Sequence, residues 1–231
     1  MQSLRLPGWR STLRITPLRH PIDVQQSIKL HGALHTVAGI GHDTERSACQ
    51  RPLIVLIPRD PISPRFESES WEAHWMHPEA HRLSDTKKPM EIFGAVRRVE
   101  IGPMHEVTQQ LPPVGSYKVT VRSVTPLLIK SAGQLVARMN RGVYVGTVHQ
   151  SVRRWFGKTD WMDAAALNFE RFAEQPLTTD TRWSGGAIAG HMVTWQGRVN
   201  EAGLLALRVC EQLGMGSTVS RGFGRIHVAV E

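Results

Sequence analysis

The chain has 231 residues, of which 41% are hydrophobic, and it carries a formal net charge of +8. This length allows one large domain or two small ones, and the apolar fraction supports a hydrophobic core. The two cysteines, Cys49 and Cys210, lie far apart, which excludes a disulfide framework and fits a reducing compartment. No apolar run approaches transmembrane length. The positive charge favours a polyanion partner, most simply a nucleic acid, over a protein that is basic without one.

Residues 1–23 are basic and are interrupted by prolines. Their basic side chains are Arg5, Arg10, Arg14, Arg19 and His20. Two structures fit this composition: an exposed arm, or a strand and loop that present arginines to phosphate. No apolar signal core follows these arginines, so we expect a cytoplasmic protein.

Three segments of the first half have the apolar spacing or the short apolar run of β-strands. They are residues 28–37, 53–57 and 95–101. Residues 58–65 hold three prolines and predict a loop. The strand expected first carries His31 and His35, and the strand expected last carries Arg97 and Arg98.

Residues 67–83 predict a short helix, on one face of which three histidines fall three and four positions apart. They are His74, His77 and His81. Such a spacing is able to bind a metal, but Pro78 interrupts the set and no cysteine accompanies it. Surface histidines on an aromatic-rich helix are the stronger interpretation, so we predict neither a metal nor a cofactor.

The segment Pro112-Pro113-Val114-Gly115 predicts a domain boundary, which divides the chain into residues 1–113 and 114–231. After it, apolar periodicity predicts the elements in order. They are a strand from Tyr117 to Lys130, a helical stretch over residues 134–156, a helix from Asp160 to Pro176, a hairpin over residues 183–199, a helix over residues 201–213, and a last strand that ends at Val230.

This order is β-α-β-β-α-β, which is the ferredoxin-like order. The first half is interpreted as a looser copy, with strands near residues 28, 53 and 95, although no direct sequence repeat is visible. We therefore predict an α+β chain of two tandem ferredoxin-like domains. A fold class alone does not give a function.

A glycine-rich loop, residues 214–225, joins the last helix to the last strand. It contains two Gly-x-Gly pairs, Gly214–Gly216 and Gly222–Gly224, together with Arg221 and Arg225. Glycine allows positive φ and close approach of a ligand, and successive free N–H groups form an anion-binding concavity. Arginines add forked donors for phosphate. We expect a phosphate contact here, and a turn that serves geometry alone is the alternative.

This loop, between a leucine-rich helix and a final strand, resembles the glycine-rich loop of the CRISPR-associated endoribonucleases that cut precursor CRISPR RNA at each repeat. These enzymes belong to the RAMP (repeat-associated mysterious protein) superfamily. The expected hairpin is similar too, with Ala187-Ile188-Ala189-Gly190 and Trp195-Gln196-Gly197, as is the strand Val119-Thr120-Val121 that leads to Thr125-Pro126-Leu127. The resemblance covers about the last half of the chain.

The resemblance implies two tandem ferredoxin-like (RRM-like) domains with a positive cleft between them, where the glycine loop contacts the RNA backbone. It also implies cleavage without a metal: the RNA 2′-hydroxyl attacks the neighbouring phosphate and yields a 2′,3′-cyclic phosphate and a 5′-hydroxyl. Many members use a histidine of the first domain, whereas a branch from type IV CRISPR systems looks arginine-based. The arginine-rich start and Arg221 point to that branch.

Such chemistry needs a group that handles the 2′-hydroxyl proton, positive charge at the phosphorane, and a proton for the 5′-oxygen. Arginine serves the second need because it stays protonated, and histidine serves either proton transfer near neutral pH. The candidate catalytic residues are Arg221, Arg19, Arg14 and His20, with His31 and His35 as alternatives. The candidate RNA-binding residues are Gly214, Gly216, Ser217, Ser220, Gly222, Gly224, Arg225, Lys130, Arg138, Arg141, Arg153 and Arg154.

The leading hypothesis is therefore a repeat-RNA endoribonuclease that stays on its hairpin product, the mature crRNA, in an effector complex with other Cas subunits, and has no membrane partner. The runner-up is a non-catalytic RAMP subunit that binds guide RNA. A general RNA-binding protein of the translation machinery is the third hypothesis. The sequence does not separate the three, because each accounts for the basic charge.

Overall fold

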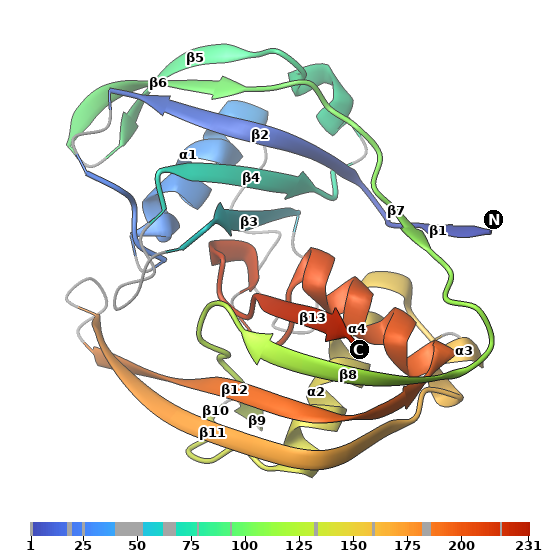
Figure 1. The fold of residues 1–231 in the computed structure, drawn as a ribbon. Helices are drawn as coiled ribbons and strands as arrows, with labels where there is room; N and C mark the ends of the chain where they lie inside the picture. The colour runs from blue at the N-terminus through green and yellow to red at the C-terminus, as the bar shows by residue number, and fades with distance from the viewer. Residues whose placement is uncertain are drawn as a thin grey trace. The chain divides into compact units, whose positions relative to one another are not determined.

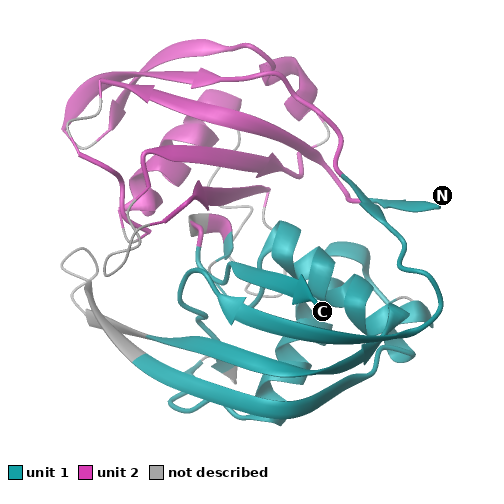
Figure 2. Ribbon diagram, viewed as in Figure 1, with its two compact units in different colours: residues 1–5, 108–219, 223–231 teal, residues 6–107, 220–222 magenta. Residues whose placement is uncertain are grey.

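The computed structural model describes residues 2–17, 20–24, 26–39, 53–61, 68–77, 79–92, 94–131, 134–158, 160–181, 186–217 and 219–231. They form two compact units (Figure 2). Unit 1 comprises Met1–Arg5, Thr108–Val219 and Phe223–Glu231, and unit 2 comprises Leu6–Val107 and Ser220–Gly222. The chain thus leaves unit 2 between Val107 and Thr108, upstream of the boundary that Pro112 and Pro113 predict.

Unit 2 is built on a five-stranded antiparallel sheet in the order β3-β4-β2-β6-β5. Its strands are β2 (Trp9–Thr16), β3 (Ile54–Arg59), β4 (Ser70–Trp75), β5 (Lys87–Ile92) and β6 (Ala95–Ile101). The helix α1 (Ser27–Ala38) links β2 to β3, and the short 3-10 helix η2 (Ala80–Leu83) precedes β5 (Figure 1). Without β5, the strand order is that of a ferredoxin-like domain in which η2 replaces the second helix.

The strand predicted over residues 28–37 is wrong, because this segment is α1. Its buried apolar residues Leu30, Leu34 and Val37 recur every three or four positions, which is the helical period. Gly39 ends the helix in the left-handed region, with φ at 68°, and its N–H donates to carbonyls of the last turn.

The strands predicted over residues 53–57 and 95–101 are confirmed as β3 and β6. The strand β3 continues through Pro58 to Arg59, so the predicted loop begins too early. The helix predicted over residues 67–83 is wrong, since its first part is β4. Trp71 and Trp75 are both buried, and a spacing of four places two side chains on one face of a helix or of a strand alike.

Unit 1 is built on a four-stranded sheet in the order β11-β12-β8-β13. Its strands are β8 (Ser116–Ser123), β11 (Leu167–Thr181), β12 (Gly186–Asn200) and β13 (Ile226–Val230), and its helices are α2 (Arg141–Phe156), α3 (Asp160–Asp163) and α4 (Glu201–Leu213). The short pairs are β1 (Ser3–Arg5) with β7 (Thr108–Gln110) and β9 (Lys130–Ser131) with β10 (Gln134–Leu135). The order β8, α2, β11, β12, α4, β13 is the predicted ferredoxin-like order.

The helix predicted from Asp160 to Pro176 is wrong beyond α3, because β11 begins at Leu167. A register shift between Phe169 and Arg171 marks a β-bulge. The bulge lets Phe169 and Phe172 face the same core, a spacing of three that imitates a helix. Pro176 is tolerated because β11 is an edge strand, where one missing N–H donor costs no ladder bond.

Of the other elements predicted for unit 1, two are confirmed and the rest have different bounds or pairing. The helix over residues 201–213 and the last strand to Val230 are confirmed as α4 and β13. The predicted hairpin over residues 183–199 is wrong for its described part, because residues 186–199 belong to the single strand β12, whose partner is β11. The first strand ends at Ser123 instead of Lys130, and the helical stretch begins at Arg141.

The core of unit 1 lies between its sheet and the helices α2 and α4 (Figure 1). The ring of Tyr144, on α2, lies 6.0 Å from that of Trp195, on β12. The helix α4 begins where the Asn200 side chain accepts a hydrogen bond from the Gly203 N–H. In the described part of the chain, no helix is long and apolar enough to cross a membrane.

The buried side chain of His191 connects the segment before α2 to the sheet of unit 1 through hydrogen bonds. The side chain of His191 is 1% exposed. Its Nδ1 lies 2.6 Å from Glu174 Oε1, and its Nε2 lies 2.8 Å from the Val136 carbonyl oxygen. The Met139 N–H also donates to Glu174 Oε1, over 3.0 Å. One imidazole therefore connects β11, β12 and residues 136–139.

We predict that His191→Ala lowers the free energy of unfolding by about 2 kcal/mol or more, because it leaves buried polar atoms without their partner. Denaturant unfolding followed by circular dichroism measures this change. The control is His227→Ala, whose side chain is 51% exposed and which should change stability by less than about 0.5 kcal/mol. Equal losses in the two variants would contradict a fastening role for His191.

Candidate functional site

A pocket of about 650 Å³ lies in unit 2, where β2 ends and β4 begins. Its ionisable lining residues are Arg14, His20, Arg59, Glu69 and Glu72. Trp71 forms part of the wall. The pocket thus combines guanidinium, imidazole and carboxylate groups in one volume.

Strand alternation brings these side chains together. On β2, the buried Leu13 and Ile15 alternate with the exposed Thr12 and Arg14, because successive side chains of a strand point to opposite faces. Thr12 lies opposite Glu72 in the antiparallel register. On the next strand pair, Arg59 lies opposite Ser70, which also lines the pocket.

Glu72 links two arginines of this unit. Its carboxylate Oε1 lies 3.4 Å from Arg59 Nη1, and the two side chains are 12% and 58% exposed. Burial lowers the pKa of the Arg10 guanidinium, and the charge of Glu72 opposes that shift. Glu72 therefore compensates a buried charge and also limits the freedom of Arg59, whose guanidinium stays largely exposed.

The charges of the described lining residues bear on the chemistry of the pocket. Among these residues, two arginines, Arg14 and Arg59, stand with two carboxylates, Glu69 and Glu72. The carboxylates disfavour the non-specific binding of anions in this pocket. It suits a substrate that needs forked donors on one side and proton transfer on the other, and imidazole can perform that transfer near neutral pH.

The predicted catalytic residues meet different outcomes. Arg14 and His20 line the same pocket, whereas Arg19 lies outside the described residues. For Arg221 the backbone is described, as the end of the 3-10 helix η3 (Val219–Arg221), but the side chain is not. The alternatives His31 and His35 are buried in α1 and do not line the pocket.

Sequence reasoning missed three pocket residues, Arg59, Glu69 and Glu72. The sequence predicts a loop at Pro58 and Arg59, although β3 extends through both residues. It predicts a helix at Glu69 and Glu72, where the structure has β4 from Ser70 onward. The usable signal was the alternation of Val55, Ile57 and Arg59, but the strand that pairs with these residues is not readable from one sequence.

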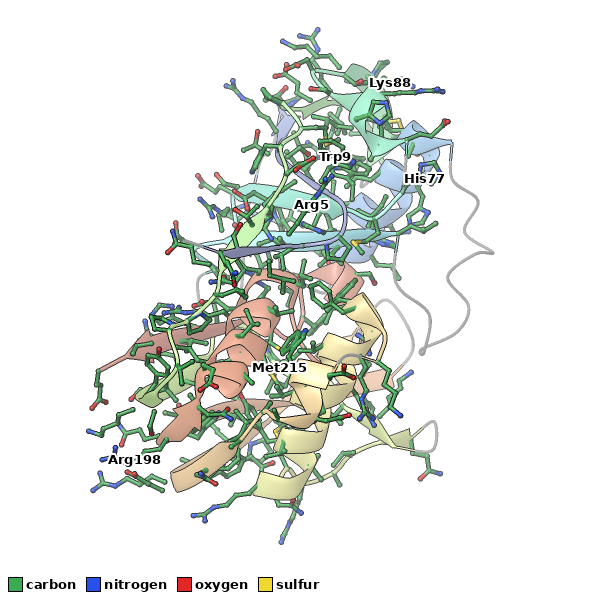
Figure 3. The ribbon with its side chains drawn as sticks, turned by 90° about the vertical axis from the view of Figure 1, so that its right-hand side faces the viewer. Arg5, Trp9, His77, Lys88, Arg198 and Met215 are labelled. Atoms are coloured by element: carbon green, nitrogen blue, oxygen red, sulfur yellow. The ribbon has the colours of Figure 1, made fainter. Side chains whose placement is uncertain are left out.

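The glycine-rich loop has the backbone conformation that its glycines predict. The φ angles of Gly214, Gly216, Gly222 and Gly224 are 79°, 86°, 87° and 74°. Met215, between the first two glycines, is fully buried (Figure 3). The loop therefore needs positive φ at all four positions, a conformation that glycine adopts without strain.

The expectation of successive free N–H groups is wrong for the two ends of this loop, residues 214–217 and 224–225. The N–H groups of Met215 and Gly224 donate to the carbonyls of Gly224 and Pro126, each over 2.9 Å. The N–H of Gly216 donates to Ser151 Oγ over 3.1 Å. The N–H groups of Gly214 and Ser217 donate to the carbonyls of Cys210 and Leu128. The N–H of Arg225 donates to Thr125 Oγ1. These groups hold the loop together and are not available to an anion.

Gly222 belongs to unit 2 and lies against the wall of the pocket. A Cβ at this position would lie 3.0 Å from Pro58 Cδ and 3.1 Å from Trp71 Cζ3. Trp71 lines the pocket and donates its indole N–H to the Ser68 carbonyl over 3.1 Å. Only glycine combines the φ of 87° with this close approach.

The predicted RNA-binding cations separate into two groups. Arg154 and Arg225 donate to the carbonyls of Gly216 and Gln212, over 2.7 Å and 2.9 Å, so they support the loop. Arg153 is exposed and lies 3.3 Å from Asp163. The other exposed cations in the predicted set are Lys130, Arg138 and Arg141.

The two serines of the predicted RNA-binding set lie in the loop. Ser217 Oγ donates to the Leu128 carbonyl, and Ser220 is half-buried. The contact of these cations and serines with RNA stays a prediction.

The three histidines that the sequence places on one face of a predicted helix do not share a helix. His74 is buried in β4, where its Nε2 lies 2.6 Å from the Pro7 carbonyl oxygen. His77 follows that strand, and His81 lies in η2 with its ring 6.1 Å from that of Trp9. Among the described residues, no group of three histidine, cysteine or acidic side chains is placed to hold a metal ion.

Neighbouring arginines of α2 provide a matched test of the loop's support. We predict that Arg154→Ala lowers the free energy of unfolding by about 2 kcal/mol, because a charged donor to a partly buried carbonyl is lost. Arg153→Ala should change it by less than about 0.5 kcal/mol, as expected of an exposed ion pair. Guanidinium chloride unfolding measures both. Equal stability of the two variants would show that the Arg154 contact does not support the loop.

The close approach at Gly222 generates a second prediction. Gly222→Val should lower the free energy of unfolding by about 2 kcal/mol, through strain at positive φ and overlap with Trp71. The control is Gly146→Val on the exposed side of α2, where a Cβ meets nothing within 4 Å. Thermal unfolding followed by tryptophan fluorescence compares the two. An unchanged Gly222→Val protein would mean that the loop does not need glycine there.

No protein-family model matches this sequence, and no curated protein matches it. Solved structures do. A Cas6 product complex aligns with a TM-score of 0.57 at 11% identity, over 96% of this chain and 99% of that chain. A RAMP protein binding different RNA substrates aligns with a TM-score of 0.52 at 12% identity, over 96% and 98%. A Cas6-related protein from Pyrococcus furiosus aligns with a TM-score of 0.50 at 9% identity, over the same shares. The chain therefore has the double ferredoxin-like fold of the Cas6 and RAMP proteins.

Proposed function

We propose that this protein binds CRISPR repeat RNA and cleaves the precursor within its repeat hairpins, without a metal. The observation that carries the proposal is the pocket of unit 2, in which Arg14, His20 and Arg59 line one volume. The fold supports it, because the chain aligns over nearly its whole length with a Cas6 product complex. The net charge of +8 fits a polyanionic substrate.

In the proposed reaction the ribose 2′-oxygen attacks the adjacent phosphorus while the bond from phosphorus to the 5′-oxygen breaks. The 2′-hydroxyl loses a proton, the 5′-oxygen gains one, and the products are a 2′,3′-cyclic phosphate and a 5′-hydroxyl. His20 would perform one of these proton transfers. Arg14 and Arg59 would stabilise the charge that builds on the phosphate oxygens.

The proposal also includes the predicted arginines Arg221 and Arg19, whose side chains lie outside the described part of the structure. Arg221 would contact the phosphate backbone from the glycine-rich loop, and Arg19 would supply a further cation beside His20. Support for the first comes from the neighbouring Gly222, which lies against the pocket residue Trp71. We propose that the enzyme is arginine-based, like the type IV branch that the sequence resembles.

A non-catalytic RAMP subunit that binds guide RNA is the second candidate. The observation that favours it is the pair of carboxylates Glu69 and Glu72 in the pocket, since these repel a phosphate and offset the arginines. In either case we propose that the protein remains on the mature crRNA as part of an effector complex with other Cas subunits. The two candidates differ only in whether the RNA is cut.

The decisive experiment compares two repeat-RNA substrates in excess EDTA. We predict cleavage of the all-ribose hairpin and none of a hairpin with deoxyribose 5′ to the scissile phosphate, because internal attack then lacks its nucleophile. His20→Ala should slow cleavage by about a hundredfold or more, the scale of a lost general acid or base. The control is His105→Ala, an exposed histidine of unit 2 outside the pocket.

Three results separate the candidates. Cutting of the deoxy substrate at the normal rate would refute internal attack. Tight binding without cleavage by the unmodified protein would support the guide-RNA subunit. Equal binding of the repeat hairpin and an unrelated hairpin would instead favour a general RNA-binding protein.

A further inference from the structure

The sheet of unit 1 has a second face, away from α2 and α4, which we call the outer face. The antiparallel registers place Arg171 opposite Gln196 and Gln196 opposite Thr120, and they place Thr194 opposite Arg122. Arg122, Arg171 and Thr194 are exposed, while Gln196 and Thr120 are half-buried. The other face carries the buried residues of the same strands, among them Val121 and Trp195. The outer face is therefore polar across three adjacent strands.

A β-bulge determines that an arginine reaches this face. With strict alternation from Asn168, which pairs with Arg198, the next outward residues of β11 would be Glu170 and Phe172. The register shift between Phe169 and Arg171 instead aligns Arg171 with Gln196 and Phe172 with Trp195. Phe172 thereby packs with its ring 6.1 Å from that of Tyr144 in the core. Bulges re-aim side chains in this way.

The carboxylates of the outer face are already engaged. Glu170 Oε1 lies 3.5 Å from Arg198 Nε, and Glu231 pairs with Lys118. Arg198 points away from the ribbon at the edge of unit 1 (Figure 3). Among the residues that the structure describes, Arg122 and Arg171 have no carboxylate within ion-pair distance. The outer face therefore carries two guanidinium groups without a counter-charge.

We propose that the outer face of unit 1 binds the sugar-phosphate backbone of duplex RNA. Strand spacing and rise place Arg122 and Arg171 about 12 Å apart, so one short stretch of backbone is able to reach both. Between them stand the exposed hydroxyl of Thr194 and the amide of Gln196, which fit phosphate oxygens and 2′-hydroxyls. The Thr120 hydroxyl donates to Glu231 Oε1 over 3.0 Å and accepts from Gln196 Nε2 over 3.3 Å, so it orients the amide. No aromatic ring is described on this face, and single-stranded RNA is held largely by stacking on such rings.

This surface is separate from the pocket of unit 2, and the proposal does not depend on cleavage. A duplex that binds here is recognised by its shape and charge, without reading of its bases. The surface would thus hold the stem of a hairpin, or any other RNA duplex, whether or not the pocket cuts RNA. Binding measured without turnover distinguishes its failure from a failure of the proposed function.

The test measures the affinity of a blunt RNA duplex of arbitrary sequence, by fluorescence anisotropy at several salt concentrations. The variant is Arg122→Gln with Arg171→Gln. Each lost phosphate contact reduces the slope of log affinity against log salt by about 1, so we predict a slope lower by about 2 and a weaker affinity. The control is Arg82→Gln with Lys87→Gln, which removes the same charge from exposed, ion-paired residues of unit 2 and should leave the slope nearly unchanged.

Circular dichroism and unfolding midpoints establish that both double variants fold. A loss of affinity for the duplex that exceeds the control's, with the lower slope, supports the proposal. Equal slopes and affinities of the two variants would overturn it. The proposal would also be overturned if the double variant lost affinity for single-stranded RNA of the same sequence but kept its affinity for the duplex, since the surface would then not bind duplex RNA.

Discussion

The arrangement of unit 2 depends on the hydrogen-bond register of its central strand. β2 pairs with both β4 and β6, and this pairing sends Leu13 and Ile15 to the core and Arg14 to the opposite face. A slip of one residue would exchange every side chain between the two faces. The tight burial of Leu13, Ile15 and their neighbour Trp71 therefore stabilises the fold and, by the same registration, fixes which charged groups meet in the pocket.

Much of the fold, and part of the site, was predictable from the sequence. Helix α4 has a strong apolar period and begins at Asn200, a favoured cap. The failures have physical causes: Trp71 and Trp75 fit a helix and a strand equally, and the bulge in β11 gives a strand a helical spacing. Arg14 and His20 stood out as a basic cluster, whereas Arg59 and Glu72 join them only through long-range strand pairing, which one sequence does not encode visibly.

The glycine-rich loop illustrates how a sequence motif can predict the backbone conformation correctly and the hydrogen bonding incorrectly. Positive φ at its glycines was predictable and is present. The expected free donors are not found at the two described ends of the loop, because the N–H groups of Met215, Gly216 and Gly224 donate to other atoms of the protein. The Arg154 guanidinium is also engaged within the protein, because it donates a hydrogen bond to the Gly216 carbonyl. The physical contribution of the loop is then the hydrogen bonding of its two ends and the close approach of Gly222 to Trp71.

The two compact units are interleaved along the chain, and this has a consequence for synthesis. Unit 2 takes most of its residues from Leu6–Val107 but also includes Ser220–Gly222, and unit 1 includes Met1–Arg5. On the ribosome, the first unit to emerge nearly whole still lacks its last three residues until almost all of unit 1 has been translated. Gly222 then fills the space beside Pro58 and Trp71. The final packing of the earlier unit therefore waits for the synthesis of nearly all of unit 1, and neither unit corresponds to one uninterrupted stretch of the chain.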